Sequence, residues 1–232
     1  MNRYFLPAAL GLLAQMLPLS SAQAQHTAEQ FTQIDFGFNL PGKWKGDLQA
    51  EFRNRWADTE GAGLAPTLFY TQVGAAYAPG PDAAFGGAYR VAARSLGQGS
   101  PTWEHRFSQQ VSIVQRKGKL RFRERLMAEQ RLFSNNAFQA RHRWRLRGGL
   151  DYPLQGEKLD PGEAYLNHQA ELVAYPFEHQ PWELREQRFY TGIGWWLHNG
   201  QALEAGLENR TGRGAPSGPM EYRWILRLRW KL

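Results

Sequence analysis

Arginine recurs at alternate positions in two neighbouring stretches of the chain. Side chains at alternate positions of a β-strand point to the same side, so each stretch would present a row of cations on one face. Like charges in adjacent rows repel, and they persist only where carboxylates or bound anions compensate them. The first row contains Arg121, Arg123, Arg125 and Arg131 with Glu129, and the second contains Arg141, Arg143, Arg145 and Arg147.

Carboxylates with the matching parity occur in other segments and could compensate the charge of these cations. Two interpretations follow. Either the charges form a packed network of ion pairs that fixes the shape of the protein, or they form a basic strip that binds or conducts small anions. The matching residues, together with one further arginine of the same parity, are Glu51, Glu104, Glu171, Glu204, Glu208 and Arg188.

Catalytic and metal chemistry have little support in the sequence. The chain has no cysteine, so it can hold neither a thiolate metal site nor a cysteine nucleophile. Ser108 lies three residues from His105, which puts the two on opposite faces of a strand. The six histidines show no metal-ligand spacing. We therefore predict no catalytic residue, no metal and no cofactor. The alternative is an outer-membrane enzyme acting on envelope lipid, which would need a serine and a histidine aligned on the outer surface.

The elements that would carry these side chains are strands, because alternation of apolar and polar residues dominates the chain. At the C-terminus, apolar residues at Tyr222, Trp224, Leu226, Leu228, Trp230 and Leu232 alternate with Arg223, Arg227, Arg229 and Lys231. Eleven such segments occur, within residues 34–40, 48–53, 69–77, 85–94, 103–113, 120–132, 138–152, 166–174, 188–197, 203–208 and 221–232.

Most of these segments are long enough to cross a membrane, since a tilted membrane strand needs about 9–11 residues and a soluble strand averages roughly 5–6. A closed sheet satisfies every backbone polar group in a bilayer. The sequence therefore predicts an all-β fold, a closed antiparallel transmembrane β-barrel. Because barrels of this class have an even number of strands, we expect ten or twelve, with twelve favoured.

The first residues indicate export. Met1-Asn2-Arg3 is basic, an uncharged apolar stretch follows, and Ala22-Gln23-Ala24 suits a signal peptidase. Residues 1–24 are therefore interpreted as a cleaved signal peptide, and residues 25–232 as the barrel. Beyond residue 24 no apolar run is long enough for a membrane helix. The predicted location is the outer membrane of a Gram-negative cell.

The apolar face is expected to meet lipid and the charged face to line the lumen, as in a porin-like barrel. The alternative is a soluble barrel with its apolar face inside. Glu124 is an exception, because its parity puts it on the lipid side unless a bulge rotates it inward or it lies near the interface. Aromatic residues near strand ends of the apolar face suit two interfacial girdles, and they are Trp44, Trp56, Tyr77, Trp103, Tyr152, Tyr165, Tyr222 and Trp230.

The formal net charge of +7 would suit nucleic acid, which an exported chain rarely meets. The expected partners are instead the lipid bilayer, anionic lipopolysaccharide and small anions. The last strand resembles the C-terminal signal by which the outer-membrane assembly machinery recognises barrels, although that signal usually ends in phenylalanine. Its residues are Trp224, Leu226, Leu228, Trp230 and Leu232.

Four stretches resemble the outer-membrane family catalogued as domain of unknown function 2490. They are residues 121–131, 141–147, 165–171 and 188–194, which are strand patterns with arginines and glutamates at set positions. The likeness covers most of the chain after residue 24. It implies an outer-membrane β-barrel and supplies no activity.

Overall fold

The computed structural model describes residues 25–58, 61–96, 99–176, 183–198, 201–213 and 220–232. The proposed signal peptide, residues 1–24, lies outside this set. Among the described residues, no helix has both the length and the apolar character needed to cross a bilayer.

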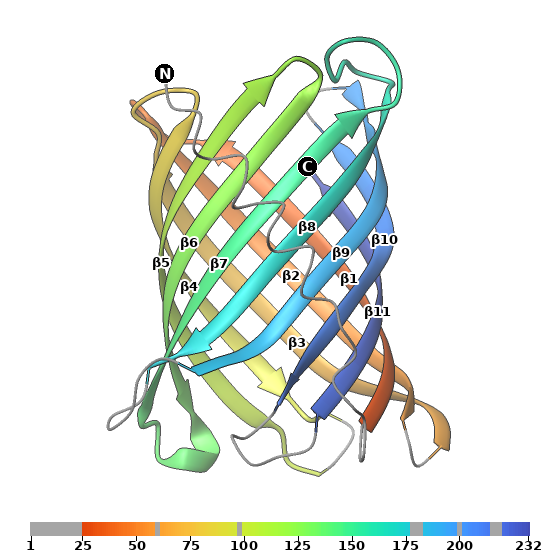
Figure 1. The fold of residues 1–232 in the computed structure, drawn as a ribbon. Coiled ribbons are helices and arrows are strands. Elements are labelled where there is room, and N and C mark those ends of the chain that lie inside the picture. The colour runs from red at the N-terminus through yellow and green to blue at the C-terminus, as the bar shows by residue number, and fades with distance from the viewer. Residues whose placement is uncertain (1–24, 59–60, 97–98, 177–182, 199–200, 214–219) are drawn as a thin grey trace.

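The described residues form eleven strands and one short 3-10 helix, and the strands close into a barrel (Figure 1). The strands are 12 to 17 residues long. Their bounds are β1 Gln25–Asn39, β2 Trp44–Asp58, β3 Gly61–Tyr77, β4 Ala83–Arg94, β5 Thr102–Lys117, β6 Leu120–Phe133, β7 Ala140–Pro153, β8 Ala164–Tyr175, β9 Glu183–Trp196, β10 Ala202–Arg213 and β11 Met220–Lys231, and the helix η2 is Ser134–Asn136.

Each strand pairs antiparallel with its neighbour in sequence, and β1 pairs with β11 in parallel. The expectation of an even number with twelve strands favoured is therefore wrong, and so is that of a wholly antiparallel sheet. Each of the eleven alternating segments overlaps one strand, although Leu40, Phe138, Leu197 and Leu232 lie just outside the strand bounds. With an odd number of strands, the first and last run in the same direction, so the barrel can close only through a parallel pair.

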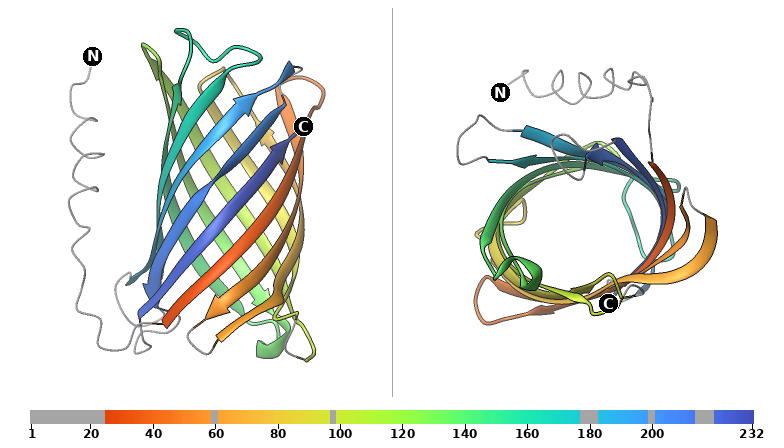
Figure 2. Two further views of the ribbon diagram at one scale, coloured as in Figure 1. Left: turned by 90° about the vertical axis from the view of Figure 1, so that its right-hand side faces the viewer. Right: turned by 90° about the horizontal axis from the view of Figure 1, so that it is seen from below.

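The closing pair is regular over its length. Its register runs from Gln25 opposite Glu221 to Asp35 opposite Lys231. Two backbone hydrogen bonds extend it, from Leu232 N to Asp35 O at 2.8 Å and from Gly37 N to Leu232 O at 3.1 Å. The tilted strands thus form one continuous ring (Figure 2).

The two ends of the barrel differ in what they carry. At the C-terminal end β11 finishes, and the connections β1–β2, β3–β4, β5–β6, β7–β8 and β9–β10 lie there (Figure 1). The longest described connection, between Pro153 and Ala164, belongs to this end. The connection that contains η2 lies at the opposite end, where Arg94 and Phe133 finish their strands.

The outer face is apolar and the inner face is charged. Large apolar side chains such as Phe85 and Leu207 are exposed on the outer face, whereas 16 polar or charged side chains of the described residues are buried. Trp44, Trp56, Trp103 and Trp230 lie on the outer face as expected. Tyr165 does not: it is 2% exposed and points inward, which corrects its assignment to the apolar face. Its neighbour Leu166 is the outward residue of that pair.

Glu124 lies on the outer face without any bulge. It is exposed, and its register partners are Ile113 on β5 and Gly148 on β7. The pairings of β6 with both neighbours run without a register shift. Regular pairing on both sides therefore leaves this carboxylate on the outer face, and no bulge turns it into the barrel.

Candidate functional site

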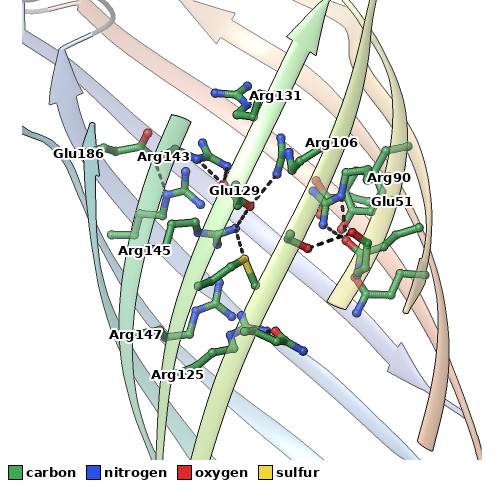
Figure 3. Close-up of a pocket in the computed structure, with 18 of the residues that line it drawn as sticks. Glu51, Arg90, Arg106, Arg125, Glu129, Arg131, Arg143, Arg145, Arg147 and Glu186 are labelled. Carbon is green, nitrogen blue, oxygen red and sulfur yellow. Dashed lines mark hydrogen bonds and ion pairs between the residues drawn. The ribbon is translucent and has the colours of Figure 1, made fainter. Parts of the chain in front are cut away.

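The barrel encloses a cavity of about 1480 Å³ lined mostly by polar side chains. Its lining includes Arg94 and Arg141, at the end opposite the C-terminus. It extends to Gln49, Ser112 and Arg123 in the half nearer the C-terminal end. The arginines converge on this space from several strands, as Figure 3 shows for β6 and β7.

Local alternation places these side chains inside. On β7, Arg143 and Arg145 are buried, whereas the alternate residues Trp144 and Leu146 are exposed. On β6, Glu129 is buried and Leu126 is exposed. The polar rows of the sequence are thus the inner surface of the barrel.

Glu104 on β5 is the first of a chain of shared carboxylates. It is fully buried and contacts three arginines. Arg94 Nε donates to it at 2.5 Å, Arg106 Nη2 at 2.6 Å and Arg131 Nε at 2.7 Å. Arg106 also reaches Glu129 Oε1 at 3.3 Å, which links this group to the next.

Glu129 and Glu171 extend the chain across β6, β7 and β8. Glu129 pairs with Arg143 and, at 3.1 Å, with Arg145 (Figure 3). Arg145 Nη2 donates to Glu171 Oε1 at 2.7 Å, so that one guanidinium joins two carboxylates. Glu171 also accepts from Arg147 at 2.6 Å, and its Oε1 lies 3.0 Å from a nitrogen of Arg188.

We call this connected group the arginine wall. Within the part of the chain that the structure describes, it joins seven arginines to four glutamates, an excess of three positive charges. Its members are Glu104, Glu129, Glu171 and Glu186 with Arg94, Arg106, Arg131, Arg143, Arg145, Arg147 and Arg188.

Three further arginines line the cavity with no ion pair to any described carboxylate. Arg90 donates to Gln72 Oε1 at 2.7 Å and lies 3.6 Å from the centre of the Tyr70 ring. Arg125 has one hydrogen bond, to Gln110 Oε1 at 3.4 Å. Arg141 lies 5.8 Å from the Phe133 ring centre. These residues enlarge the positive excess of the arginine wall.

A second group lines the barrel around the closing strands, and we call it the seam network. Its charges balance, with five cations and five carboxylates among the described residues. The members are Arg53, Arg210, Arg227, Arg229 and Lys231 with Glu29, Asp35, Glu51, Glu204 and Glu208.

Aromatic rings pack among the cations of the seam network. Phe31 is an apolar residue on the otherwise charged inner face, and it is 1% exposed. The guanidinium carbon of Arg227 lies 4.6 Å from its ring centre and that of Arg53 lies 5.6 Å away. Arg227 also lies 4.4 Å from the ring centre of Tyr190. Cation–π contacts thus add to the ion pairs here.

The inner face near the C-terminal end is filled on the side of β8 to β11. Glu204 is 2% exposed and pairs with Lys231. It accepts a hydrogen bond from Tyr165 Oη at 2.5 Å and one from Asn167 Nδ2 at 3.3 Å. The Tyr165 ring lies over Gly194, where an added Cβ would approach it to 2.3 Å. Gly194 therefore makes the room that this ring needs.

The residues predicted from sequence are distributed over both groups and one smaller cluster. Arg121 and Arg123 belong to neither group; they contact Asp151 at 4.0 and 2.6 Å. Glu51 pairs with Arg53 at 2.8 Å in the seam network. The other predicted members lie in the arginine wall or line the cavity beside it, except Glu204 and Glu208, which lie in the seam network.

Sequence reasoning left several contributors out of the predicted set. Arg94, Arg106 and Arg229 all have the inward parity of their segments, so alternation alone could have identified them. Asp151 and Tyr165 have it too. Phe31 has the inward parity of Gln33 and Asp35, so alternation gives the correct face although its apolar character suggests the other one.

The histidines and serines form no catalytic arrangement on the described residues. His105 Nδ1 lies 2.6 Å from Tyr89 Oη. Ser108 lines the cavity and donates to Ala88 O at 3.3 Å. The described residues include no cluster of three or more potential metal ligands.

These features define the chain as a closed β-barrel with a buried arginine–glutamate network. Residues 29–220 match the family model described as Protein of unknown function (DUF2490), and the chain belongs to that family. Comparisons with curated proteins and with solved structures gave no match.

Proposed function

We propose that this protein is a non-catalytic barrel of the bacterial outer membrane that admits small anions into an arginine-rich lumen. The proposal has two parts, the location of the barrel and the chemistry of its interior. Each part rests on a different face of the sheet and has its own test.

The outer face supports the membrane location. It exposes large apolar side chains on every strand except β8, including Trp44, Phe85 and Leu207. An apolar surface of this extent is unfavourable in water and favourable in lipid. Strands of 12 to 17 residues are long enough to cross a bilayer at a tilt. In that location the neighbours of the barrel would be phospholipid and lipopolysaccharide.

The outward residues of β11 support the same location. Trp224 and Trp230 are 54% and 46% exposed, and Leu226, Leu228 and Leu232 share their face. This is the arrangement expected if the outer-membrane assembly machinery recognises the last strand. Separation of inner and outer membranes tests the location, combined with gel mobility of boiled and unboiled samples. A barrel found in the soluble fraction would disprove it.

The positive excess of the arginine wall carries the second part. A network that only filled the lumen would be most stable with its charges matched, as in the seam network. Here seven arginines share four glutamates, and three more arginines line the cavity without a carboxylate partner among the described residues. Such an excess attracts mobile anions.

Conductance in planar bilayers tests this chemistry. With a KCl gradient, the wild-type barrel should give a reversal potential that indicates preference for chloride over potassium. The double variant Arg125→Glu/Arg141→Glu should reduce or invert that preference, because it replaces two cations in the cavity without breaking an ion pair. Arg116→Glu is the control outside the cavity lining, since Arg116 is 59% exposed and its ion pair with Asp82 is exposed as well.

Each outcome separates the two interpretations of the charge network. Cation preference in the wild type, or a double variant identical to wild type, would contradict anion entry. A folded barrel without conductance would leave the purely structural interpretation, in which the ion pairs only fix the shape of the lumen.

A further inference from the structure

Arg125 and Arg147 face each other across β6 and β7 inside the cavity. They are direct register partners, and Ser112 on β5 is the register partner of Arg125 on the other side. All three line the cavity. Figure 3 shows the two guanidinium groups next to each other. Like charges opposite each other on a sheet destabilise it unless an anion compensates them.

Two carboxylates come into question as partners of this pair, Glu171 and Asp47. Asp47 lines the same cavity but makes no ion pair with either arginine. Arg147 reaches Glu171 Oε2 at 2.6 Å, but Glu171 also serves Arg145 and Arg188. Arg125 has only the amide oxygen of Gln110, at 3.4 Å. Little of the charge on this pair is therefore neutralised by the described residues.

Arg123 adds a third guanidinium on the same face, two residues from Arg125. Its Nη2 donates to Asp151 at 2.6 Å, whereas its Nε is buried without a hydrogen-bond partner. A buried guanidinium nitrogen without an acceptor is costly, and a bound oxygen would remove that cost.

We propose that Arg123, Arg125 and Arg147 form a binding site for a free, phosphate-type oxyanion. Guanidinium groups present paired N–H donors that match the oxygens of phosphate. The amide nitrogen of Gln110 and the hydroxyl of Ser112 add neutral donors. The inference deepens the proposed function and rests on it in one respect, which is that anions enter the lumen.

The closed sheet separates the site from the surroundings of the barrel and so restricts which ligands can reach it. The site lies on the inner surface of a closed barrel, within a cavity of about 1480 Å³. Lipid acyl chains lie on the other side of that sheet under the proposed function. The ligand is therefore a small soluble anion, and inorganic phosphate is the probe.

Binding of phosphate to the purified full-length barrel in detergent tests the site, by calorimetry against a chloride background. Arg125→Gln should weaken phosphate binding by about tenfold or more, since hydrogen bonds to charged groups contribute this much. The variant leaves no carboxylate stranded, because Arg125 pairs with none among the described residues. Arg125→Lys should give intermediate affinity, since it keeps the charge and loses the paired donors.

Arg141→Gln is the matched control. It removes the same charge from the same cavity at the end opposite the C-terminus. It should change affinity by no more than about twofold, because charges separated by more than a Debye length are largely screened. Gel mobility of unboiled samples verifies that each variant is folded.

Absence of phosphate binding in the wild type would overturn the site, as would equal weakening by Arg125→Gln and Arg141→Gln. Failure of the proposed function is distinguishable. Anion-selective conductance without phosphate binding would remove the site and keep the proposed function. Phosphate binding by a barrel that conducts no anions would keep the site as a binding pocket and remove the conduit.

Discussion

The arginine wall and the seam network are built from the same residue types and differ in their balance. In the seam network five cations meet five carboxylates, whereas in the arginine wall seven arginines share four. The difference lies in how the carboxylates are used. Asp35 forms an ion pair with Arg229 alone, whereas Glu104, Glu129 and Glu171 each form ion pairs with three arginines.

This contrast assigns different roles to the two regions. The seam network lies where the parallel pair β1–β11 closes the sheet, and matched charges there stabilise the closure. The arginine wall lies on strands that are joined to their neighbours by hairpins. The hairpins already constrain the register of these strands, so matched charges are less important there. Its unmatched charge is available to a ligand.

The largest effect is expected at Glu129, at the centre of the arginine wall. Glu129→Gln removes the carboxylate that contacts Arg106, Arg143 and Arg145. Breaking a buried ion pair from one side costs about 3–5 kcal/mol, and this substitution should lower the free energy of unfolding by that order. Urea titration of the folded barrel, followed by gel mobility, measures it.

Glu221→Gln is the control for this prediction. Glu221 pairs once, with Arg223 at 2.9 Å, and both side chains are about 30% exposed. Its loss should cost less than about 1 kcal/mol. Equal costs for the two substitutions would contradict a central role for Glu129.

The seam network should respond to single substitutions by a smaller amount. Asp35→Asn removes the close partner of Arg229, which keeps only Glu204 at 4.0 Å. We expect a loss of about 1–3 kcal/mol. The double variant Asp35→Asn/Arg229→Gln should recover part of it, because no unpaired cation remains. If the double variant lost more free energy of unfolding than the two single variants together, the pairing would be contradicted.

Much of this division was readable from alternation in the sequence. The inward parity of Arg143, Arg145 and Glu129 followed from strand geometry alone. The sharing of one carboxylate by three arginines did not, because it depends on side-chain reach across several strands. The number of strands follows from the eleven alternating segments themselves, whereas the even number usual in such barrels predicts ten or twelve.

The predicted outward position of Tyr165 is wrong for a different reason. Its aromatic character near a strand end suggested an outward girdle position, and parity with Leu166 pointed inward. The structure follows parity, because Tyr165 Oη finds Glu204 at 2.5 Å and its ring finds space over Gly194. Alternation is set by the backbone and is the stronger signal, whereas residue type only reports where a side chain is commonly found.

Gly194→Ala tests that space and should affect the C-terminal end without altering the arginine wall. The added Cβ would approach the Tyr165 ring to 2.3 Å and displace it from Glu204. Overpacking of this kind costs about 1–3 kcal/mol, and Tyr165→Leu in the same chain should restore part of the loss. Single-channel conductance should rise as the ring moves. An unchanged conductance would indicate that Tyr165 does not restrict the lumen.

The smallest effect on stability is expected at Arg125, and it distinguishes the two regions most directly. Arg125→Gln removes a cation opposite Arg147 and breaks no ion pair among the described residues. Like-charge pairs on a sheet cost roughly 0.2–1 kcal/mol, so the variant should be as stable as wild type or slightly more stable in buffer without phosphate. Added phosphate should raise the urea midpoint of the wild type more than that of the variant, since a ligand stabilises the state that binds it. A clear loss of stability without phosphate would show that Arg125 is a structural member of the network, as the seam cations are, and would remove the difference between the two regions.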